Sequence, residues 1–215
     1  MLGLALLAKE LLPSSLVRQK LDCRGSVLFT FDDGPHPEIT PRVLDVLDRY
    51  GAKGLFFVPG VRIPRAPELL REILRRGHGL GNHSFQHRDA SLLAGHEITA
   101  DLCQCRREIQ QITGFFTRVY RPPKGIVTTG ALRAAWKTEH SIVRWSLDSG
   151  EYSSLRKGSS ADLAQNVLAK IHDRAIILSH DDVPAVPGYL EAVLPRLLDR
   201  GIDLNRGLES LRWNS

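Results

Sequence analysis

The chain contains little cysteine, with three residues in 215. Such a low content excludes a disulfide scaffold, which requires paired cysteines at high density. Cys103 and Cys105 lie two positions apart in a segment of helical periodicity, so their side chains point to different faces. No second cysteine pair or nearby histidine accompanies them in the sequence, so we do not expect a cysteine-bound zinc site there.

An excess of one charge and long hydrophobic runs are scarce too. The 29 Lys and Arg against 24 Asp and Glu give a net charge of +5, and the basic residues are scattered, so composition provides no reason to expect a nucleic-acid partner. No apolar run reaches the roughly 18 residues of a membrane span. The apolar segment Met1–Ala8 lacks a basic leader and is short for a secretory signal. We expect an amphipathic helix ending at Pro13 and slightly favour the cytoplasm, with a trimmed signal or cell-envelope association as the alternative.

The composition is that of one globular domain. Hydrophobic residues make up 42% and charged residues 25%, which excludes the disordered, collagen-like and coiled-coil classes. A chain of 215 residues corresponds to one domain and is long enough to bury a substantial core.

Short apolar runs alternate with segments of helical periodicity, and Gly, Pro or Asp turn residues separate them. The apolar runs predict buried strands and the periodic segments predict helices. This alternation predicts an α/β fold with a mostly parallel sheet and helices outside it. The expected strands are 26–31, 55–58, 79–82, 118–120, 141–145, 175–178 and a short one at 201–204. The expected helices are 39–50, 67–76, 91–113, 129–137, 160–172 and 189–200.

Polar side chains that carry chemistry gather where the predicted strands end. In α/β barrels and open α/β sheets, sites lie at the carboxyl ends of the strands. Clusters on this one rim would converge in space, whereas chance would put as many on the opposite rim. The clusters are Asp32 and Asp33 after the first strand, His83 and His87 after the third, Arg121 after the fourth, Asp148 and Glu151 after the fifth, and His180 after the sixth.

His83 and His87 are four positions apart, which puts both imidazoles on one face of a helical turn or of an extended stretch. Two such imidazoles suit a divalent metal of the zinc or cobalt kind, although the pair alone also fits ordinary surface or core histidines. A metal site needs a carboxylate as well, and the adjacent Asp32 and Asp33 supply one while leaving the other free as a base. In isolation, these aspartates also fit an Asp-Gly-Pro turn with a helix-capping acid.

A metal bound by one Asp and two His keeps positions open for water and substrate. It lowers the pKa of bound water to about 7 and polarises a carbonyl oxygen. A free carboxylate beside that water can take its proton, and a histidine across the site can protonate the leaving group. His180, after the predicted strand 175–178, is placed for the second role; the alternative is a partly buried histidine that Asp181 or Asp182 satisfies.

Five segments together resemble the polysaccharide deacetylases, the NodB-type family also called carbohydrate esterase family 4. They occur in order over nearly the whole chain, from about Arg24 to Leu211. They are Thr30–Pro35 (TFDDGP), Gly81–His87 (GNHSFQH), Arg121–Gly125 (RPPKG), Trp145–Tyr152 (WSLDSGEY) and Ile177–Asp181 (ILSHD).

The resemblance implies a distorted, incomplete (β/α)7-8 barrel. It also implies a metal-dependent hydrolase that removes acetyl groups from N-acetylated sugars of a glycan or oligosaccharide. In this family pattern, Asp32 is the general base, His180 the general acid, and Arg121 orients and charge-balances Asp32. The metal ligands are Asp33, His83 and His87, for which we expect Zn²⁺, with Co²⁺ or Ni²⁺ as alternatives.

The resemblance further implies that Leu178 lines the pocket for the acetyl methyl group. The backbone N–H near Lys124 would help to stabilise the oxyanion. Pro123, Lys124 and Tyr152 are the other expected substrate-binding residues.

Two motifs depart from the family pattern. An aromatic residue usually follows the prolines of the third motif, where this chain has Lys124, which would meet an anionic sugar group or solvent. The fourth motif usually ends in Asp-Trp, where this chain has Glu151 and Tyr152. Glu151 can still hold a histidine in its charged form, Asp148 would share that work, and Tyr152 can still form a wall of the pocket. These departures affect substrate choice more than activity.

The resemblance divides the chain into an N-terminal extension, 1–23, and a deacetylase domain, 24–215, of a length that favours a minimal catalytic domain. Two alternative functions remain at this stage. The same site would serve an O-acetyl ester or another linear C–N amide. A non-catalytic carbohydrate-binding module of the same fold would be expected to have lost a metal or base residue, and none is lost here.

Overall fold

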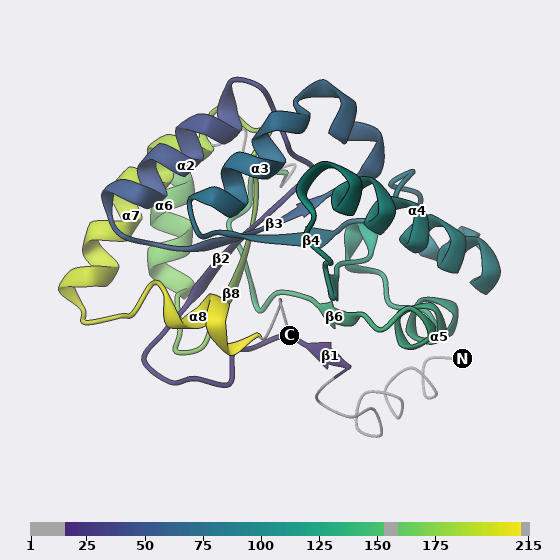
Figure 1. Ribbon diagram of the computed structural model, residues 1–215. Coiled ribbons are helices and arrows are strands. Elements are labelled where there is room, and N and C mark those ends of the chain that lie inside the picture. Colours follow the sequence, from purple (N-terminus) through teal and green to yellow (C-terminus); the bar gives the residue numbers. More distant parts are fainter. Residues whose placement is uncertain (1–15, 153–158, 212–215) are drawn as a thin grey trace.

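The computed structural model describes residues 16–152 and 159–211 (Figure 1). Their strands form one eight-stranded sheet in the order β1-β6-β5-β4-β3-β2-β8-β7, and every neighbouring pair is parallel. The strands are β1 (Val17–Arg18), β2 (Leu28–Asp32), β3 (Gly54–Val58), β4 (Gly79–Asn82), β5 (Val119–Tyr120), β6 (Ser141–Val143), β7 (Leu147–Asp148) and β8 (Ile176–His180).

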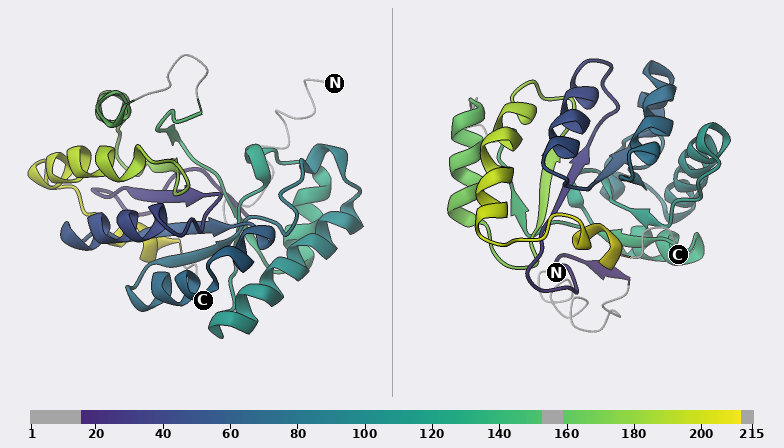
Figure 2. Two further views of the ribbon diagram at one scale, coloured as in Figure 1. Left: turned by 90° about the horizontal axis from the view of Figure 1, so that it is seen from above. Right: turned by 60° about the vertical axis from the view of Figure 1, so that its left-hand side comes forward.

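Helices cover the outside of the curved sheet, so the expected alternation of strands and helices is present (Figures 1 and 2). The α-helices are α2 (Ile39–Arg49), α3 (Pro67–Arg75), α4 (Gly95–Thr113), α5 (Thr129–Lys137), α6 (Ser160–Lys170), α7 (Val186–Asp199) and α8 (Arg206–Ser210). Short 3-10 helices are η1 (Gly60–Arg65), η2 (Ala90–Leu92) and η3 (Pro123–Gly125). Among the described residues, β1 and β7 end the strand order without pairing with each other, so the barrel that they form is open, as expected.

The core lies between the central strands and the apolar faces of the helices. All five residues of β2, β3 and β8 are buried. Strands of a parallel sheet are covered on both faces and therefore have continuous apolar sequences, which explains why they were predictable. Helix α2 buries Val43, Leu44 and Leu47, which recur at the 3.6-residue period.

The shortest elements differ from the sequence expectations. Strands β1 and β7 have only two residues each, too few to show a periodicity. The strand expected at 201–204 is wrong: only Asp203 forms a single bridge, to Ser26. The Asp203 carboxylate accepts hydrogen bonds from the N–H groups of Asn205 and Arg206, so the chain turns there into α8, which the sequence analysis missed.

Two helix boundaries also differ. The helix expected at 91–113 is divided into η2 and α4, because Leu93 and Ala94 are extended between them. The Glu97 carboxylate accepts the Ala94 N–H at 2.9 Å at the start of α4, which is one half of a capping box, because Ala94 has no side-chain acceptor for the other half. Helix α7 begins at Val186 rather than Tyr189, since a proline in the first turn is compatible with a helix.

The predicted N-terminal helix ending at Pro13 lies outside the described residues. From residue 16 onward the chain joins the fold, because β1 pairs with β6 and Leu21 is buried. The domain boundary at residue 24 stays a prediction. None of the helices in the described ranges combines the length and hydropathy that crossing a membrane requires.

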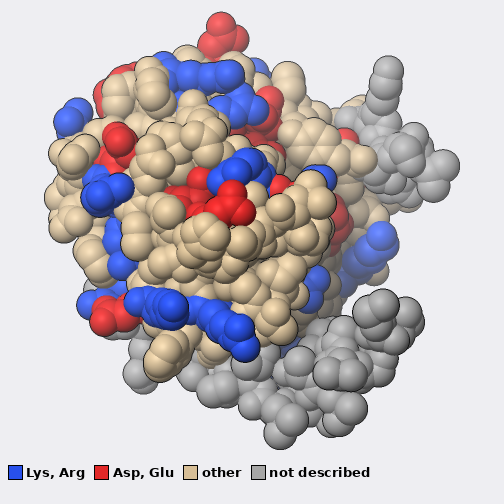
Figure 3. Space-filling model, turned by 90° about the vertical axis from the view of Figure 1, so that its right-hand side faces the viewer, with Lys and Arg blue, Asp and Glu red and all other residues tan. Residues whose placement is uncertain are grey.

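On the face shown in Figure 3, Lys and Arg side chains form separate groups around a central group of Asp and Glu. The net charge of +5 is therefore not gathered into one basic surface on that face.

Candidate active site

The predicted clusters meet at the carboxyl end of the sheet. Strands β2 and β8 are neighbours in a register that pairs Asp32 with His180, and both residues line a cavity of about 580 Å³. The other residues lining this cavity are Asp33, His83, His87, Lys124, Trp145, Asp148, Gly150, Tyr152, Asn166, Lys170 and Leu178. Residues from all the predicted clusters except Arg121 and Glu151 therefore line one cavity at this rim.

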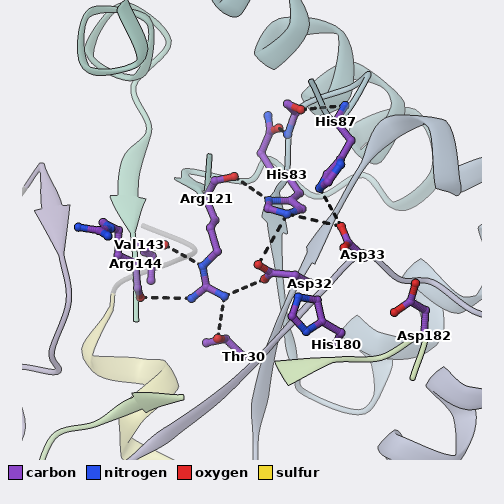
Figure 4. Close-up of polar contacts among 12 residues, drawn as sticks. Thr30, Asp32, Asp33, His83, His87, Arg121, Val143, Arg144, His180 and Asp182 are labelled. Carbon is purple, nitrogen blue, oxygen red and sulfur yellow. Dashed lines mark hydrogen bonds and ion pairs between the residues drawn. The ribbon is translucent and has the colours of Figure 1, made fainter. Parts of the chain in front are cut away.

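Asp32 is held by the buried guanidinium of Arg121 (Figure 4). Arg121 Nη1 donates to Asp32 Oδ1 at 2.7 Å and to Thr30 Oγ1 at 2.8 Å. Arg121 Nε donates to the Val143 carbonyl at 2.9 Å, and Nη2 to the Arg144 carbonyl at 3.2 Å. Because four acceptors surround the guanidinium, it is fixed in place. It binds Oδ1 of Asp32, and Oδ2 accepts no hydrogen bond from it.

Aromatic rings complete the surroundings of Arg121. Its guanidinium carbon lies 4.2 Å from the centre of the Phe57 ring and 5.5 Å from the Trp145 ring, distances at which a ring face attracts a cation. Trp145 in turn lies so close to Gly125 that a Cβ there would come within 2.4 Å of the indole. The glycine that follows Lys124 is thus required by the approach of this ring.

Three side chains converge as candidate metal ligands. Asp33 Oδ1 lies 2.9 Å from His87 Nε2 and 3.6 Å from His83 Nε2, and one ligand atom from each of the three residues lies within 4.8 Å of the others. His83 Nδ1 donates to the Arg121 carbonyl at 2.7 Å, which fixes the ring and directs Nε2 toward Asp33. A ligating histidine typically has its other nitrogen held in this way, so the donor set fits a divalent cation.

Protonation of two of these groups also suits a metal site. Burial raises the pKa of Asp33, but the hydrogen bond from His87 and the electrostatic effect of the surrounding histidines outweigh it, and the pKa is about 2. Burial lowers the pKa of His83. An ionised carboxylate and a neutral imidazole are the forms that bind a metal. The hydrogen bond with Asp33 raises the pKa of His87, so His87 would give up a proton as a cation binds.

The two histidines come together through an irregular loop and not through helical or extended periodicity. Ser84 and His87 have φ of 64° and 54°, which is the left-handed region. Ser84 Oγ accepts the His87 N–H at 3.1 Å and so supports this conformation. Asp33 is left-handed too, with φ of 69°, and this turns its side chain to His87 while Asp32 faces Arg121.

His180 is paired with Glu151, one of the residues that depart from the family pattern. His180 Nδ1 lies 3.6 Å from Glu151 Oε2, and the Glu151 side chain is fully buried. Ser149 Oγ donates to the same carboxylate oxygen. Burial lowers the pKa of His180, but Glu151 and Asp32 outweigh it and raise the pKa to about 9. His180 therefore carries a proton to give at neutral pH.

Replacing Glu151 with Gln is expected to lower the pKa of His180, because the charge of Glu151 then no longer offsets the lowering effect of burial. The acid form of His180 is present below pH 9 and is lost as the pH rises through about 9. The alkaline limb of kcat/KM should move to lower pH by roughly the 1–3 units that a close opposite charge contributes. Asp148→Asn should move it less, because Glu151 makes the ion pair. Equal shifts in kcat/KM pH profiles of both variants would contradict this division of roles.

The remaining predicted residues have different positions. Leu178 lines the cavity and is 5% exposed. Lys124 lies on the exposed rim, where Nζ pairs with Asp89 Oδ2 at 3.3 Å. The Tyr152 ring packs on His180 with centroids 4.3 Å apart. Pro123 is buried and is not among the residues lining the cavity.

Several residues that shape the cavity were not predicted from the sequence. Asn166 and Lys170 come from α6, and the Asn166 amide donates to the Asp148 and Ser149 carbonyls at 3.1 and 2.8 Å. Polar residues on an amphipathic helix give no signal that distinguishes them from solvent-facing ones. Trp145 could have been found, because it begins the fourth motif.

The family model described as Polysaccharide deacetylase matches residues 20–143 of this chain. The chain belongs to the polysaccharide deacetylase family. The predicted family is therefore confirmed.

Two curated relatives and one solved structure illustrate the similarity. A peptidoglycan-N-acetylglucosamine deacetylase of Bacillus cereus is 29% identical over 187 residues, 83% of this chain and 65% of the relative. A chitooligosaccharide deacetylase of Bradyrhizobium sp. is 36% identical over 179 residues, 81% of this chain and 80% of the relative. The chitin deacetylase of Colletotrichum lindemuthianum superposes with a TM-score of 0.84 at 22% identity, covering 95% of this chain and 97% of that one.

This superposition confirms the fold of the family member as the incomplete barrel of NodB-type deacetylases. The chain spans only 65% of the Bacillus cereus relative.

Proposed function

We propose that this polysaccharide deacetylase family member is a metal-dependent hydrolase that removes acetyl groups from N-acetylated sugars of a glycan. One observation carries the proposal. A carboxylate held by a buried arginine and a protonated histidine lie side by side at one cavity, next to an Asp-His-His ligand set. This arrangement provides a base, an acid and a cation site for cleavage of one amide bond.

Asp33, His83 and His87 would hold the cation, for which zinc is the expected metal because imidazole ligands suit it. A divalent cation there supplies Lewis acidity, which activates a water and polarises the acetyl carbonyl oxygen. The chain supplies the proton transfers. Asp32 Oδ2, which faces away from Arg121, takes the proton of the attacking water.

His180 then gives its proton to the sugar nitrogen as the C–N bond breaks, which leaves acetate and a free amine. Glu151 lies on the Nδ1 side of the ring, at 3.6 Å, so Nε2 is the nitrogen that donates. Leu178 offers an apolar contact to the acetyl methyl group, in keeping with its place in the cavity wall.

Relatives named as deacetylases of peptidoglycan N-acetylglucosamine and of chitooligosaccharides support N-acetylglucosamine oligomers as the substrate class. The test is acetate release from defined N-acetylglucosamine oligomers, with and without a chelator, beside an O-acetylated glycan. We expect release from the N-acetylated oligomers that stops with chelator. Release from the O-acetylated glycan alone would reassign the bond, and no release from any acetylated sugar would overturn the proposal.

A further inference from the structure

The loop that carries both histidines has all five of its backbone N–H groups hydrogen-bonded. The Val58 carbonyl accepts from His83 at 3.1 Å, Asn82 Oδ1 from Ser84 at 2.9 Å, and Ser84 Oγ from His87. The two remaining N–H groups belong to Phe85 and Gln86, and one carboxylate from helix α4 accepts both.

That carboxylate is Asp101 of α4. Its Oδ2 accepts the Phe85 N–H at 2.8 Å, and both oxygens lie within reach of the Gln86 N–H, at 3.2 and 3.3 Å. Asp101 is 5% exposed. Arg88 is a charged neighbour, with its Nη2 4.0 Å from Asp101 Oδ1. A carboxylate that accepts backbone N–H groups binds them more strongly than a neutral oxygen does.

The carbonyl side of the same loop is fixed independently. The Ser84 carbonyl accepts the Gly60 N–H at 3.0 Å, and the Phe85 carbonyl accepts the Val61 N–H at 2.9 Å. A Cβ on Gly60 would come within 2.0 Å of the Phe85 ring, so η1 packs closely against the loop. Asp101 therefore closes the one side of the loop that η1 does not hold.

We propose that Asp101 is a positioning residue that preforms the metal site by fixing the left-handed loop between His83 and His87. Without the carboxylate, two N–H groups lose their acceptor and the loop is free to leave its strained conformation. His87 Nε2 then departs from Asp33. This inference rests on the metal site of the proposed function, and concerns a residue that touches neither metal nor substrate.

The first measurement is the Zn²⁺ dissociation constant, obtained by competition with a chromogenic chelator. Asp101→Asn leaves one neutral oxygen for two N–H groups and places an NH₂ donor where the second oxygen was, so it should weaken Zn²⁺ binding by roughly 10- to 100-fold, the effect typical of outer-shell partners. At saturating Zn²⁺, its KM should be close to that of the parent protein. Glu97→Gln is the matched control, since Glu97 lies one turn away on α4, where it caps the helix start and pairs with the exposed Arg88 at 3.6 Å, and accepts no N–H of the loop. Its Zn²⁺ affinity should equal that of the parent.

The outcomes separate the two proposals. Equal Zn²⁺ affinity of Asp101→Asn and the parent overturns the role of Asp101 and leaves the proposed function intact. Equal losses in Asp101→Asn and Glu97→Gln also overturn it, because helix stability alone would then explain both. A parent protein that binds no Zn²⁺ overturns the zinc site itself, and the inference with it.

Amide hydrogen exchange of the metal-free parent protein tests the role even if Asp101→Asn fails to fold. The Phe85 and Gln86 amides should exchange at least about 100-fold more slowly than unstructured peptide amides, as hydrogen-bonded groups in ordered segments do. Unprotected exchange that slows only when Zn²⁺ is added would show that the metal orders the loop, and would overturn the proposal.

Discussion

Replacing Asp32 with Asn is expected to lower kcat by roughly 10²- to 10⁴-fold, the contribution typical of a general base. Asn keeps the shape of the side chain and an oxygen that accepts from Arg121 Nη1, but it cannot take a proton from water. Steady-state acetate release measures the effect. The variant should keep its Zn²⁺ affinity, because Asp33, His83 and His87 form the candidate ligand set.

The variant should also lose stability, because Arg121 is fully buried and loses its ionised partner. Breaking a buried ion pair costs about 3–5 kcal/mol when one charge is left unpaired. The oxygen of Asn and the three other acceptors of Arg121 reduce that cost.

Asp45→Asn is a matched control, since Asp45 pairs with Arg76 on the exposed surface at 2.7 Å. It should change kcat little and stability by less than about 1 kcal/mol. An Asp32→Asn variant that releases acetate as fast as the parent would disprove the role of Asp32 as base.

Removal of the divalent metal is expected to reduce acetate release to the background rate, and added Zn²⁺ should restore it. The reason is that without the cation no group activates the attacking water or polarises the acetyl carbonyl oxygen. Replacing a single acid or base residue leaves that activation in place. Acetate release is measured on dialysed protein against added Zn²⁺, Co²⁺ and Ni²⁺ in turn. Activity that persists in protein shown to be metal-free would contradict the prediction.

Asp33→Asn complements chelation. The Asp33 carboxyl has a pKa of about 2, so the parent offers an ionised ligand throughout the neutral range and the variant offers a neutral one. Asn also tolerates the left-handed backbone of this position, so folding should be preserved. We expect weaker Zn²⁺ binding, with activity that rises as Zn²⁺ is added. The Asp45→Asn variant should need no added metal beyond that of the parent.

The rim that carries the candidate site could be predicted from the sequence because its residues lie at or directly after the ends of apolar strands. Asp32 and His180 are the last residues of β2 and β8, so recognising the strands was enough to place them together. The turns after the strands could not be predicted. Asp33, Ser84 and His87 all have positive φ, and none is the glycine by which such positions are usually recognised. Their conformations depend on partners that are remote in sequence.

Asp101 shows what limited the prediction of supporting residues. It lies on the buried side of α4 with Ile98, Leu102 and Cys105, at the spacing of one helical face. An acidic residue at an apolar-face position was a signal that a buried acceptor was needed there. The sequence did not show which backbone N–H groups it would accept, because the loop and α4 meet only in the folded protein.

The open edges of the sheet bear on how copies of this protein behave beside one another. An unclosed barrel presents rows of unpaired N–H and C=O groups to which a foreign strand can add, a common route to aggregation. Here both edge strands, β1 and β7, are two residues long and include a charged residue, Arg18 or Asp148. An intruding strand would gain few hydrogen bonds at either edge, so the fold keeps its cavity accessible without offering a long template for association between molecules.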